Sequence, residues 1–154
     1  MFDMKVYIDT SALNRIFDDQ LQTRIYIESS SMLIVFKLID SGVIEFVTSD
    51  VCLFENSSNP YEERRAFVNL CIQKAKHIQT IHEGILKRAQ EIEKQQIKGI
   101  DALHLASAEK LNADYFLTCD DIILKRYKGS LKIQNPADFV INFLRKESPD
   151  VSQN

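Results

Sequence analysis

The sequence predicts an α/β fold in which a central parallel sheet of four or five short strands lies between layers of helices. Short apolar runs, each suited to a buried strand, alternate with longer segments of helical periodicity. This alternation is typical of a parallel sheet, because each crossover between strands carries a helix and the helices cover both faces. Glycine and proline are scarce, with four and three residues, which favours a compact domain with short loops.

The first half of the chain contains two of the predicted strands. The expected elements are a strand at 4–8, a short helix to about 17, a long helix at roughly 21–40, a strand at 44–47 and a helix that breaks up around 57–59. Ser11 is expected to cap the short helix, and Gly42 to end the long one. Ser49 or Asp50 is expected to cap the helix after the second strand, because short polar side chains accept hydrogen bonds from the first backbone amides.

Helical periodicity dominates the second half of the chain. The expected elements are helices from 60, at 81–92, at 101–111 and at 122–127, strands at 115–118 and, on an edge, 131–133, and a last helix from 136 to about 145. Pro60 suits the first position of its helix, which should bury Phe67, Leu70 and Cys71. Asp121 is expected to cap the helix that follows the third strand.

Length and composition are those of one globular domain, expected at residues 1–147, followed by a flexible tail at 148–154. The net charge of −3 gives no basic signature for nucleic acid, although the acids of a metal site would account for part of it. The three cysteines include no Cys-x-x-Cys pair, which predicts reduced thiols rather than disulfides or a zinc site. No signal peptide or run of ~18 apolar residues is visible, so we expect a cytoplasmic protein with no membrane segment.

Carboxylates stand where the predicted strands end and where a late helix begins. Asp9 follows the first strand, Glu55 lies in the helix after the second, Asp101 begins a helix and Asp120 follows the third strand. Ligands of open parallel sheets bind outside the carboxyl ends of the strands, so these side chains are expected to converge. Carboxylate oxygens suit Mg²⁺ or Mn²⁺, which hydrolyse phosphodiesters by activating water. The simpler alternatives are that Asp9 caps the first helix and that Asp101 is an ordinary first-turn residue.

Four motifs in this order resemble those of PIN-domain ribonucleases, in particular the VapC-like toxins of type II toxin–antitoxin systems. They are VYIDTSALNR at 6–15, SDVCLFE at 49–55, DALHLASA at 101–108 and LTCDD at 117–121. The resemblance implies a PIN-like three-layer α/β/α sandwich and a metal-dependent endoribonuclease that uses Mg²⁺ or Mn²⁺ to cleave RNA. It assigns catalysis and metal binding to Asp9, Glu55, Asp101 and Asp120, with Thr118 in support. It also implies a cognate antitoxin and a homodimer.

Several other polar residues have two interpretations each. Asn14 and Arg15 lie one short helix beyond the first acid, where they either contact a substrate phosphate or form a helix surface with a local ion pair. Glu28 interrupts an apolar stripe and is expected either to pair with Arg15 or Arg24, or to point into the acidic cleft. His104 lies one turn after the third acid and is either catalytic or a partly buried, hydrogen-bonded histidine.

Two functions compete with the toxin nuclease. One is a catalytically silent PIN-like module for binding or assembly, and the other is a housekeeping PIN nuclease. The presence of all four acids argues against a silent domain, and the small single-domain size favours a toxin. A nucleotide-binding Rossmann module is unsupported, because the sequence has no P-loop or Gly-x-Gly-x-x-Gly motif. Titration with Mn²⁺ would separate an enzyme from a silent scaffold.

Overall fold

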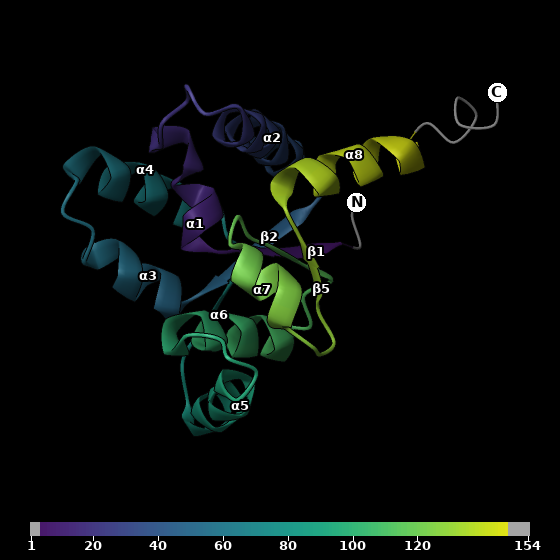
Figure 1. The fold of residues 1–154 in the computed structure, drawn as a ribbon. Helices are drawn as coiled ribbons and strands as arrows, with labels where there is room; N and C mark the ends of the chain where they lie inside the picture. Colours follow the sequence, from purple (N-terminus) through teal and green to yellow (C-terminus); the bar gives the residue numbers. More distant parts are fainter. Residues whose placement is uncertain (1–3, 148–154) are drawn as a thin grey trace.

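A computed structural model describes residues 4–147, which form one five-stranded parallel sheet with helices on both faces (Figure 1). The strands are β1 (Lys5–Ile8), β2 (Glu45–Ser49), β3 (His77–Gln79), β4 (Tyr115–Leu117) and β5 (Lys132–Gln134). The helices are α1 (Thr10–Leu13), the short 3₁₀ helix η1 (Arg15–Phe17), α2 (Thr23–Asp40), α3 (Asp50–Ser57), α4 (Glu62–Ile72), α5 (Glu83–Glu93), α6 (Gly99–Lys110), α7 (Asp121–Arg126) and α8 (Pro136–Glu147). The expected α/β fold with a central parallel sheet is confirmed.

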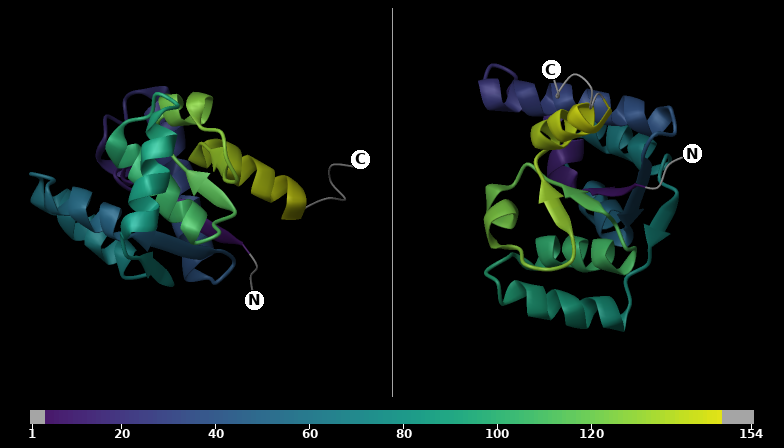
Figure 2. Two further views of the ribbon diagram at one scale, coloured as in Figure 1. Left: turned by 90° about the horizontal axis from the view of Figure 1, so that it is seen from below. Right: turned by 90° about the vertical axis from the view of Figure 1, so that its right-hand side faces the viewer.

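The sheet separates two hydrophobic cores. On one face, Val6 and Ile8 of β1 belong to a buried cluster with residues of α2, α4 and α8. On the other face, Tyr7 belongs to a cluster with residues of α5, α6 and α7. Successive side chains of a strand point to opposite faces, so β1 contributes to both cores in turn. The views in Figure 2 show helices in layers on either side of the sheet, which makes the molecule an α/β/α sandwich.

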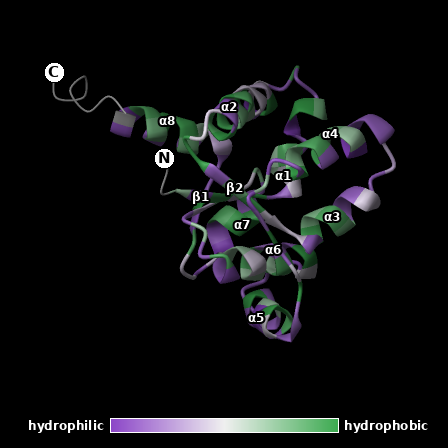
Figure 3. Cartoon of the chain, turned by 180° about the vertical axis from the view of Figure 1, so that it is seen from behind, coloured by the Kyte–Doolittle hydropathy of each residue, from purple (hydrophilic) through white to green (hydrophobic). Residues whose placement is uncertain are grey.

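Helix α5, on the outside of the molecule, is amphipathic. In α5, Ile85, Ala89 and Ile92 are buried at three- and four-residue spacing, which is the period of one helix face. Figure 3 shows hydrophobic and hydrophilic residues around α5, which packs on α6. Helix α6 lies between α5 and the sheet, and most of its residues from Ala102 to Ala108 are therefore buried.

The strand order places a crevice beside β1. The order is β3-β2-β1-β4-β5, so the chain moves from β1 to one edge of the sheet and later to the other. Where the order reverses, the connections diverge and leave a crevice outside the carboxyl ends of the strands. Here Ile8 pairs with Leu117, and the Asp9 amide donates to the Leu117 carbonyl at 3.1 Å. Asp9 and Thr118, which follow these paired residues, therefore lie side by side.

Two of the expected helix caps are wrong. The cap of α1 is Asp9, whose carboxylate accepts from the Ala12 amide, whereas Ser11 lies inside the helix. The cap of α7 is Asp120, and Asp121 is the first residue of that helix. In both places the chain offers two nearby polar residues, and the one that still has the extended backbone of the preceding segment becomes the cap.

The helix expected from Pro60 begins two residues later, at Glu62. The Asn59 side chain accepts a hydrogen bond from the Tyr61 amide at 3.0 Å. This local turn carries the chain around Pro60 before the helix starts, and it is a common use of asparagine next to proline.

The burial expected for Leu70 is also wrong, since this side chain is 59% exposed. Val68, Cys71 and Ile72 form the inward face of α4 instead, and Leu70 falls outside their three- and four-residue spacing. The edge strand β3 was not expected from the sequence. Its three residues are exposed or half-buried, so no apolar run marks it.

Other expectations are confirmed. Gly42 ends α2 with φ of 77°, a left-handed conformation that glycine adopts without strain. Ser49 caps α3 by accepting from the Val51 amide at 3.2 Å. The three cysteines are buried and free of disulfides. Within residues 4–147, no helix combines the length and apolarity needed to span a bilayer. The expected tail at 148–154 lies outside the described residues.

Candidate active site

Asp9 leaves β1 at the crevice and is held there by neutral donors. Its carboxylate accepts hydrogen bonds from the Ala12 amide (3.0 Å), the Ser11 hydroxyl (2.7 Å) and the Thr118 hydroxyl (2.6 Å). The residue is 3% exposed. Burial raises the pKa of Asp9 above its ordinary value, and these hydrogen bonds oppose the rise. Within residues 4–147, no lysine or arginine pairs with this carboxylate, and its hydrogen bonds come from neutral groups.

Thr118 joins the first acid to the fourth. Its hydroxyl donates to Asp9 and accepts from the Asp120 amide at 3.0 Å. Asp120 in turn caps α7 by accepting from the Ile122 amide at 2.8 Å through Oδ1, and its Oδ2 has no partner among the described residues. A residue at 118 must therefore both donate and accept, which a hydroxyl does and a methyl group does not.

Asp101 carries the least compensated charge of the four. It lies in the first turn of α6, and its carboxylate accepts no hydrogen bond from any residue that the structure describes. Burial raises the pKa of Asp101 to about 6, and the nearby carboxylates of Asp9 and Asp120 add to that rise. A cation among these carboxylates would remove the repulsion between them.

Glu55 reaches the cleft from α3. Its Oε1 accepts from the Thr10 hydroxyl at 2.6 Å and lies 2.5 Å from Nε2 of His104. Burial works against ionisation of Glu55, but the hydrogen bonds from His104 and Thr10 outweigh it, so the pKa of Glu55 lies below its ordinary value. Within the described part of the chain, Oε2 has no hydrogen-bond partner.

These four acids line one cleft of about 560 Å³. The structure therefore brings together the carboxylates that the sequence singled out, although they come from four different parts of the chain. Asp121, next to Asp120, is directed elsewhere and lies 2.7 Å from an Arg24 nitrogen. The roles of the four acids as catalytic residues and metal ligands stay predictions.

The donor set suits a hard divalent cation. Mg²⁺ and Mn²⁺ prefer carboxylate oxygens, and Glu55, Asp101 and Asp120 each offer at least one that lacks a partner among residues 4–147. Within that range, no three Asp, Glu, His or Cys side chains are close enough to enclose an ion as they stand. The residues fit this cation by their chemistry.

Asn14 and Arg15 lie on the wall of the cleft beyond α1. The Asn14 amide donates to the Thr10 carbonyl at 2.9 Å, and its Oδ1 is buried with no partner in the described residues. Arg15 pairs with Asp18 at 3.2 Å and with Glu28 at 2.7 Å. Arg15 therefore both lines the cleft and forms the local ion pair, and contact of Asn14 or Arg15 with a phosphate stays a prediction.

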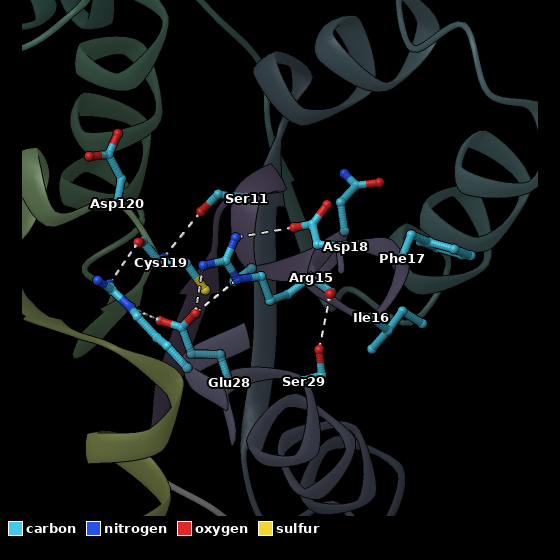
Figure 4. A network of polar contacts seen from close by, with 12 residues as sticks. Ser11, Arg15, Ile16, Phe17, Asp18, Glu28, Ser29, Cys119 and Asp120 are labelled. Atoms are coloured by element: carbon cyan, nitrogen blue, oxygen red, sulfur yellow. Dashed lines mark hydrogen bonds and ion pairs between the residues drawn. The ribbon is translucent and has the colours of Figure 1, made fainter. Parts of the chain in front are cut away.

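Glu28 is a buried carboxylate outside the cleft. It is 1% exposed, and it pairs with Arg15 at 2.7 Å and with Arg24 at 3.1 Å. The Asn135 amide also donates to it. Figure 4 shows Arg15 between the carboxylates of Glu28 and Asp18, with Asp120 directed away from this cluster. The expectation that Glu28 forms an ion pair is confirmed, and Glu28 is not among the residues that line the acidic cleft.

His104 is more deeply buried than expected. It is 1% exposed and is not among the residues that line the cleft. Its Nε2 faces Glu55, and its Nδ1 lies 2.7 Å from the Tyr7 hydroxyl. Burial raises the pKa of Tyr7 well above its ordinary value, so this hydroxyl keeps its proton. Of the two interpretations of His104, the hydrogen-bonded one describes its position.

Sequence reasoning missed two residues of the site, Tyr7 and Thr10. A signal for Tyr7 exists, because it precedes Asp9 by two residues and side chains at that spacing share one face of a strand. Thr10 lies inside the first motif, but nothing there shows that it reaches the second acid. Arg64 also lines the cleft, from α4.

Comparison with known proteins supports the fold and the motifs together. Residues 6–129 match the family described as PIN domain. No curated protein matches the sequence. Similar solved structures include VapBC2 from Rickettsia felis bound to a DNA fragment from their promoter, at 15% identity and a TM-score of 0.57 over 86% of this chain and 98% of that one.

Two more solved structures are similar to the same extent. VapBC-1 from nontypeable Haemophilus influenzae is 20% identical, with a TM-score of 0.56 over 86% of this chain and 98% of that one. A toxin–antitoxin complex from Klebsiella pneumoniae is 15% identical, with a TM-score of 0.56 over 85% and 97%. At such identities the likeness concerns the fold.

Proposed function

The chain belongs to the PIN-domain family, and from that premise we propose that it is a metal-dependent endoribonuclease that cleaves RNA phosphodiester bonds. One observation carries the proposal: four carboxylates from separate elements line one cleft, and the charge of Asp101 has no partner among residues 4–147. A buried acid with a structural role, such as Glu28, is paired with arginines. An uncompensated cluster lowers stability and is typical of a functional site.

Mg²⁺ or Mn²⁺ is the cofactor that this donor set would hold. Asp9, Glu55, Asp101 and Asp120 would supply the oxygens, and their combined negative charge would attract a divalent cation. When bound, such a cation makes a water molecule more acidic and stabilises the negative charge that develops on the phosphate.

The remaining residues of the cleft orient the acids and the substrate. Thr118 restrains Asp9 and, through a backbone amide, the segment of Asp120. Arg15 and Arg64 bring positive charge to the cleft, where Asn14 also lies. We propose that Asn14 and Arg15 contact the substrate backbone, since phosphate contacts position a nucleic acid on a protein. The chain's net negative charge does not exclude this contact, because bound cations would offset the acids.

Cleavage of a panel of labelled single-stranded and looped RNAs tests the proposed activity. The wild-type protein should cut RNA with Mn²⁺ or Mg²⁺ and stop with excess EDTA. Asp9→Asn and Asp101→Asn should abolish cleavage. Asp121→Asn is the matched control, because Asp121 neighbours a site acid but binds Arg24 outside the cleft. Cleavage that survives excess EDTA would contradict the proposal, and a wild type that neither cuts RNA nor binds Mn²⁺ would indicate a silent binding or assembly module.

We further propose that the protein is the toxin of a toxin–antitoxin pair, that it forms a homodimer and that a cognate antitoxin binds it. The support is the fold likeness to a toxin–antitoxin complex and to VapBC structures. Expression of the wild type in a bacterial host should arrest growth, and Asp101→Asn should not. The antitoxin should restore growth and co-purify, and light scattering of the pair should give the toxin stoichiometry. Normal growth with an active nuclease would favour the housekeeping alternative.

A further inference from the structure

A chain of hydrogen bonds runs through the interior to one of the four acids. The Ser49 hydroxyl lies 2.6 Å from the Tyr7 hydroxyl, which lies 2.7 Å from Nδ1 of His104, whose Nε2 lies 2.5 Å from Oε1 of Glu55. The first three residues are 0%, 0% and 1% exposed. They come from β2, β1 and α6, so the chain links three elements of the core to α3.

The direction of each hydrogen bond follows from the acid at the end. An ionised carboxylate only accepts, so Nε2 of His104 carries a proton and donates it to Glu55. In a neutral imidazole the other nitrogen then has to accept, and Tyr7 is its donor. Tyr7 in turn accepts from Ser49, whose oxygen is already the acceptor for the Val51 amide. With this assignment each donor and acceptor in the series of hydrogen bonds has a partner, and no buried positive charge is needed.

This series of hydrogen bonds restrains only one of the two oxygens of the Glu55 carboxylate. Oε1 accepts two hydrogen bonds, from His104 and from Thr10, whereas Oε2 has no partner among the described residues. Ser49 caps the start of α3, and Glu55 lies two residues before its end, so the hydrogen bonds hold this helix near both ends. Rotation of the carboxylate would break two hydrogen bonds, one of them from a fully enclosed ring.

We propose that His104, with its ring oriented by Tyr7, is a positioning residue that holds Glu55 ready to bind the cation through Oε2. This inference rests on the proposed function, because it gives Glu55 a cation to bind. The geometry carries this role, since His104 donates to Oε1 from the enclosed side and Oε2 stays without a partner among the described residues. Residues that orient metal ligands in this way typically change metal affinity or activity by 10- to 100-fold when they are replaced.

Two amide substitutions at His104 separate positioning from packing. The side-chain nitrogen of glutamine can take the place of Nε2, whereas that of asparagine ends nearer to Nδ1 and falls short of Glu55. His104→Gln should therefore keep most of the Mn²⁺ affinity measured by calorimetry, and His104→Asn should lose 10- to 100-fold. For cleavage of a saturating RNA, kcat should fall in His104→Asn while KM stays near the wild-type value, because His104 does not line the cleft. Ser107→Ala is the control for α6, since Ser107 is buried but bonds only to the Leu103 carbonyl.

Nitrogen NMR of the metal-free protein tests this assignment. The ring of His104 should carry a proton on Nε2. Tyr7→Phe removes the donor to Nδ1 and should broaden or shift these ring signals, whereas Tyr115→Phe, a buried strand tyrosine away from the cleft, should not. A proton on Nδ1 alone would overturn the proposal, and ring signals left unchanged by Tyr7→Phe would overturn the role of Tyr7.

The outcomes for the two proposals are distinct. A wild type that binds no Mn²⁺ and cuts no RNA would overturn the proposed function, and with it the inference about Glu55. A wild type that binds Mn²⁺ together with a His104→Asn variant that binds it equally well would overturn the positioning role alone. Thermal melts check that both amide variants are folded at the temperature of the calorimetry, with His104→Asn expected to melt somewhat lower because it is smaller and lacks the hydrogen bond to Glu55.

Discussion

Glu28 and the acids of the cleft differ in the groups that compensate their negative charge. Glu28 is 1% exposed, and two arginines and an asparagine amide surround it. Asp9 is 3% exposed and accepts only from an amide and two hydroxyls, and Asp101 in the same cleft accepts from no described residue. Both groups lie beside α1, η1 and the carboxyl end of the sheet, so position in the fold does not explain the difference.

The difference separates an acid whose charge is compensated within the fold from the cleft acids, for which we propose a cation. A buried charge is tolerated when it is paired and hydrogen-bonded, as Glu28 is, and the ions then join η1 to α2. The cleft acids retain repulsion that an arginine could have relieved. The retained charge is useful only if something positive enters from outside, so the comparison favours a cation site over a purely structural cluster.

The largest change in the free energy of unfolding should follow from breaking the ion pairs of Glu28. Glu28→Gln leaves Arg15 and Arg24 without their shared carboxylate, and loss of one partner of a buried pair is strongly destabilising. Because both arginines keep some contact with solvent, we expect the lower end of the usual range, about 3 kcal/mol of unfolding free energy. Urea denaturation monitored by circular dichroism measures it.

An exposed ion pair is the control for this substitution. Glu83 lies 3.6 Å from Lys87 on α5, and both side chains are largely exposed. Glu83→Gln should change the unfolding free energy by less than about 0.5 kcal/mol, since surface pairs contribute little. If Glu28→Gln were as mild as Glu83→Gln, the Glu28 cluster would not be structural and the contrast with the cleft would fail.

A somewhat smaller change in the free energy of unfolding should follow when a cation binds the cleft acids. Mn²⁺ at 100 times its dissociation constant should stabilise the wild type by about 2.7 kcal/mol, because it binds only the folded state. Asp101→Asn should lose most of that stabilisation, and Asp121→Asn should keep it. Thermal melts with and without Mn²⁺ measure the shift. Equal shifts in the two variants would mean that Mn²⁺ binds elsewhere.

The fold and the four acids could be predicted because both depend on local patterns. The strands that meet the cleft contain apolar runs, and Asp9 and Asp120 follow two of them, so the topology brings these acids to one edge. Glu55 and Asp101 lie on helices, and the motifs that resemble PIN domains indicated them. The expected caps Ser11 and Asp121 were wrong because two nearby polar residues compete for each cap. Strand β3 was not found, because an exposed three-residue edge strand carries no apolar signal.

The residues around the acids could not be predicted in the same way. Tyr7 and His104 are 97 positions apart in the sequence and form a hydrogen bond in the fold. Arg64 lines the cleft from α4. These contacts depend on how elements pack, which periodicity does not report. The ion pair of Glu28 was one of the two interpretations that the sequence offered, whereas nothing in the sequence indicated that Asp101 accepts no hydrogen bond from the described residues.

The smallest of the expected effects concerns the unpaired charge of Asp101. Its folded pKa of about 6 lies above its ordinary value of 3.8, so folding takes up a proton. The contribution of protonated Asp101 to the unfolding free energy of the metal-free protein is then fully present below about pH 4 and is lost as the pH rises through 6. Asp101→Asn removes this loss. At pH 8 the variant should be more stable than the wild type by about 1 kcal/mol, which is less than full burial would give because solvent screens the charge.

Below pH 4 the two proteins should unfold alike, because Asp101 is then protonated in both the folded and the unfolded wild type. Asp121 provides a control of opposite sign: its hydrogen bonds from Arg24 hold its pKa below the ordinary value. Asp121→Asn should therefore lose stability above pH 4 rather than gain it. Denaturant melts of the three metal-free proteins between pH 3.5 and 8 measure both trends. If Asp101→Asn were less stable than the wild type at pH 8, Asp101 would be a structural acid like Glu28, and the division between the two groups would be lost.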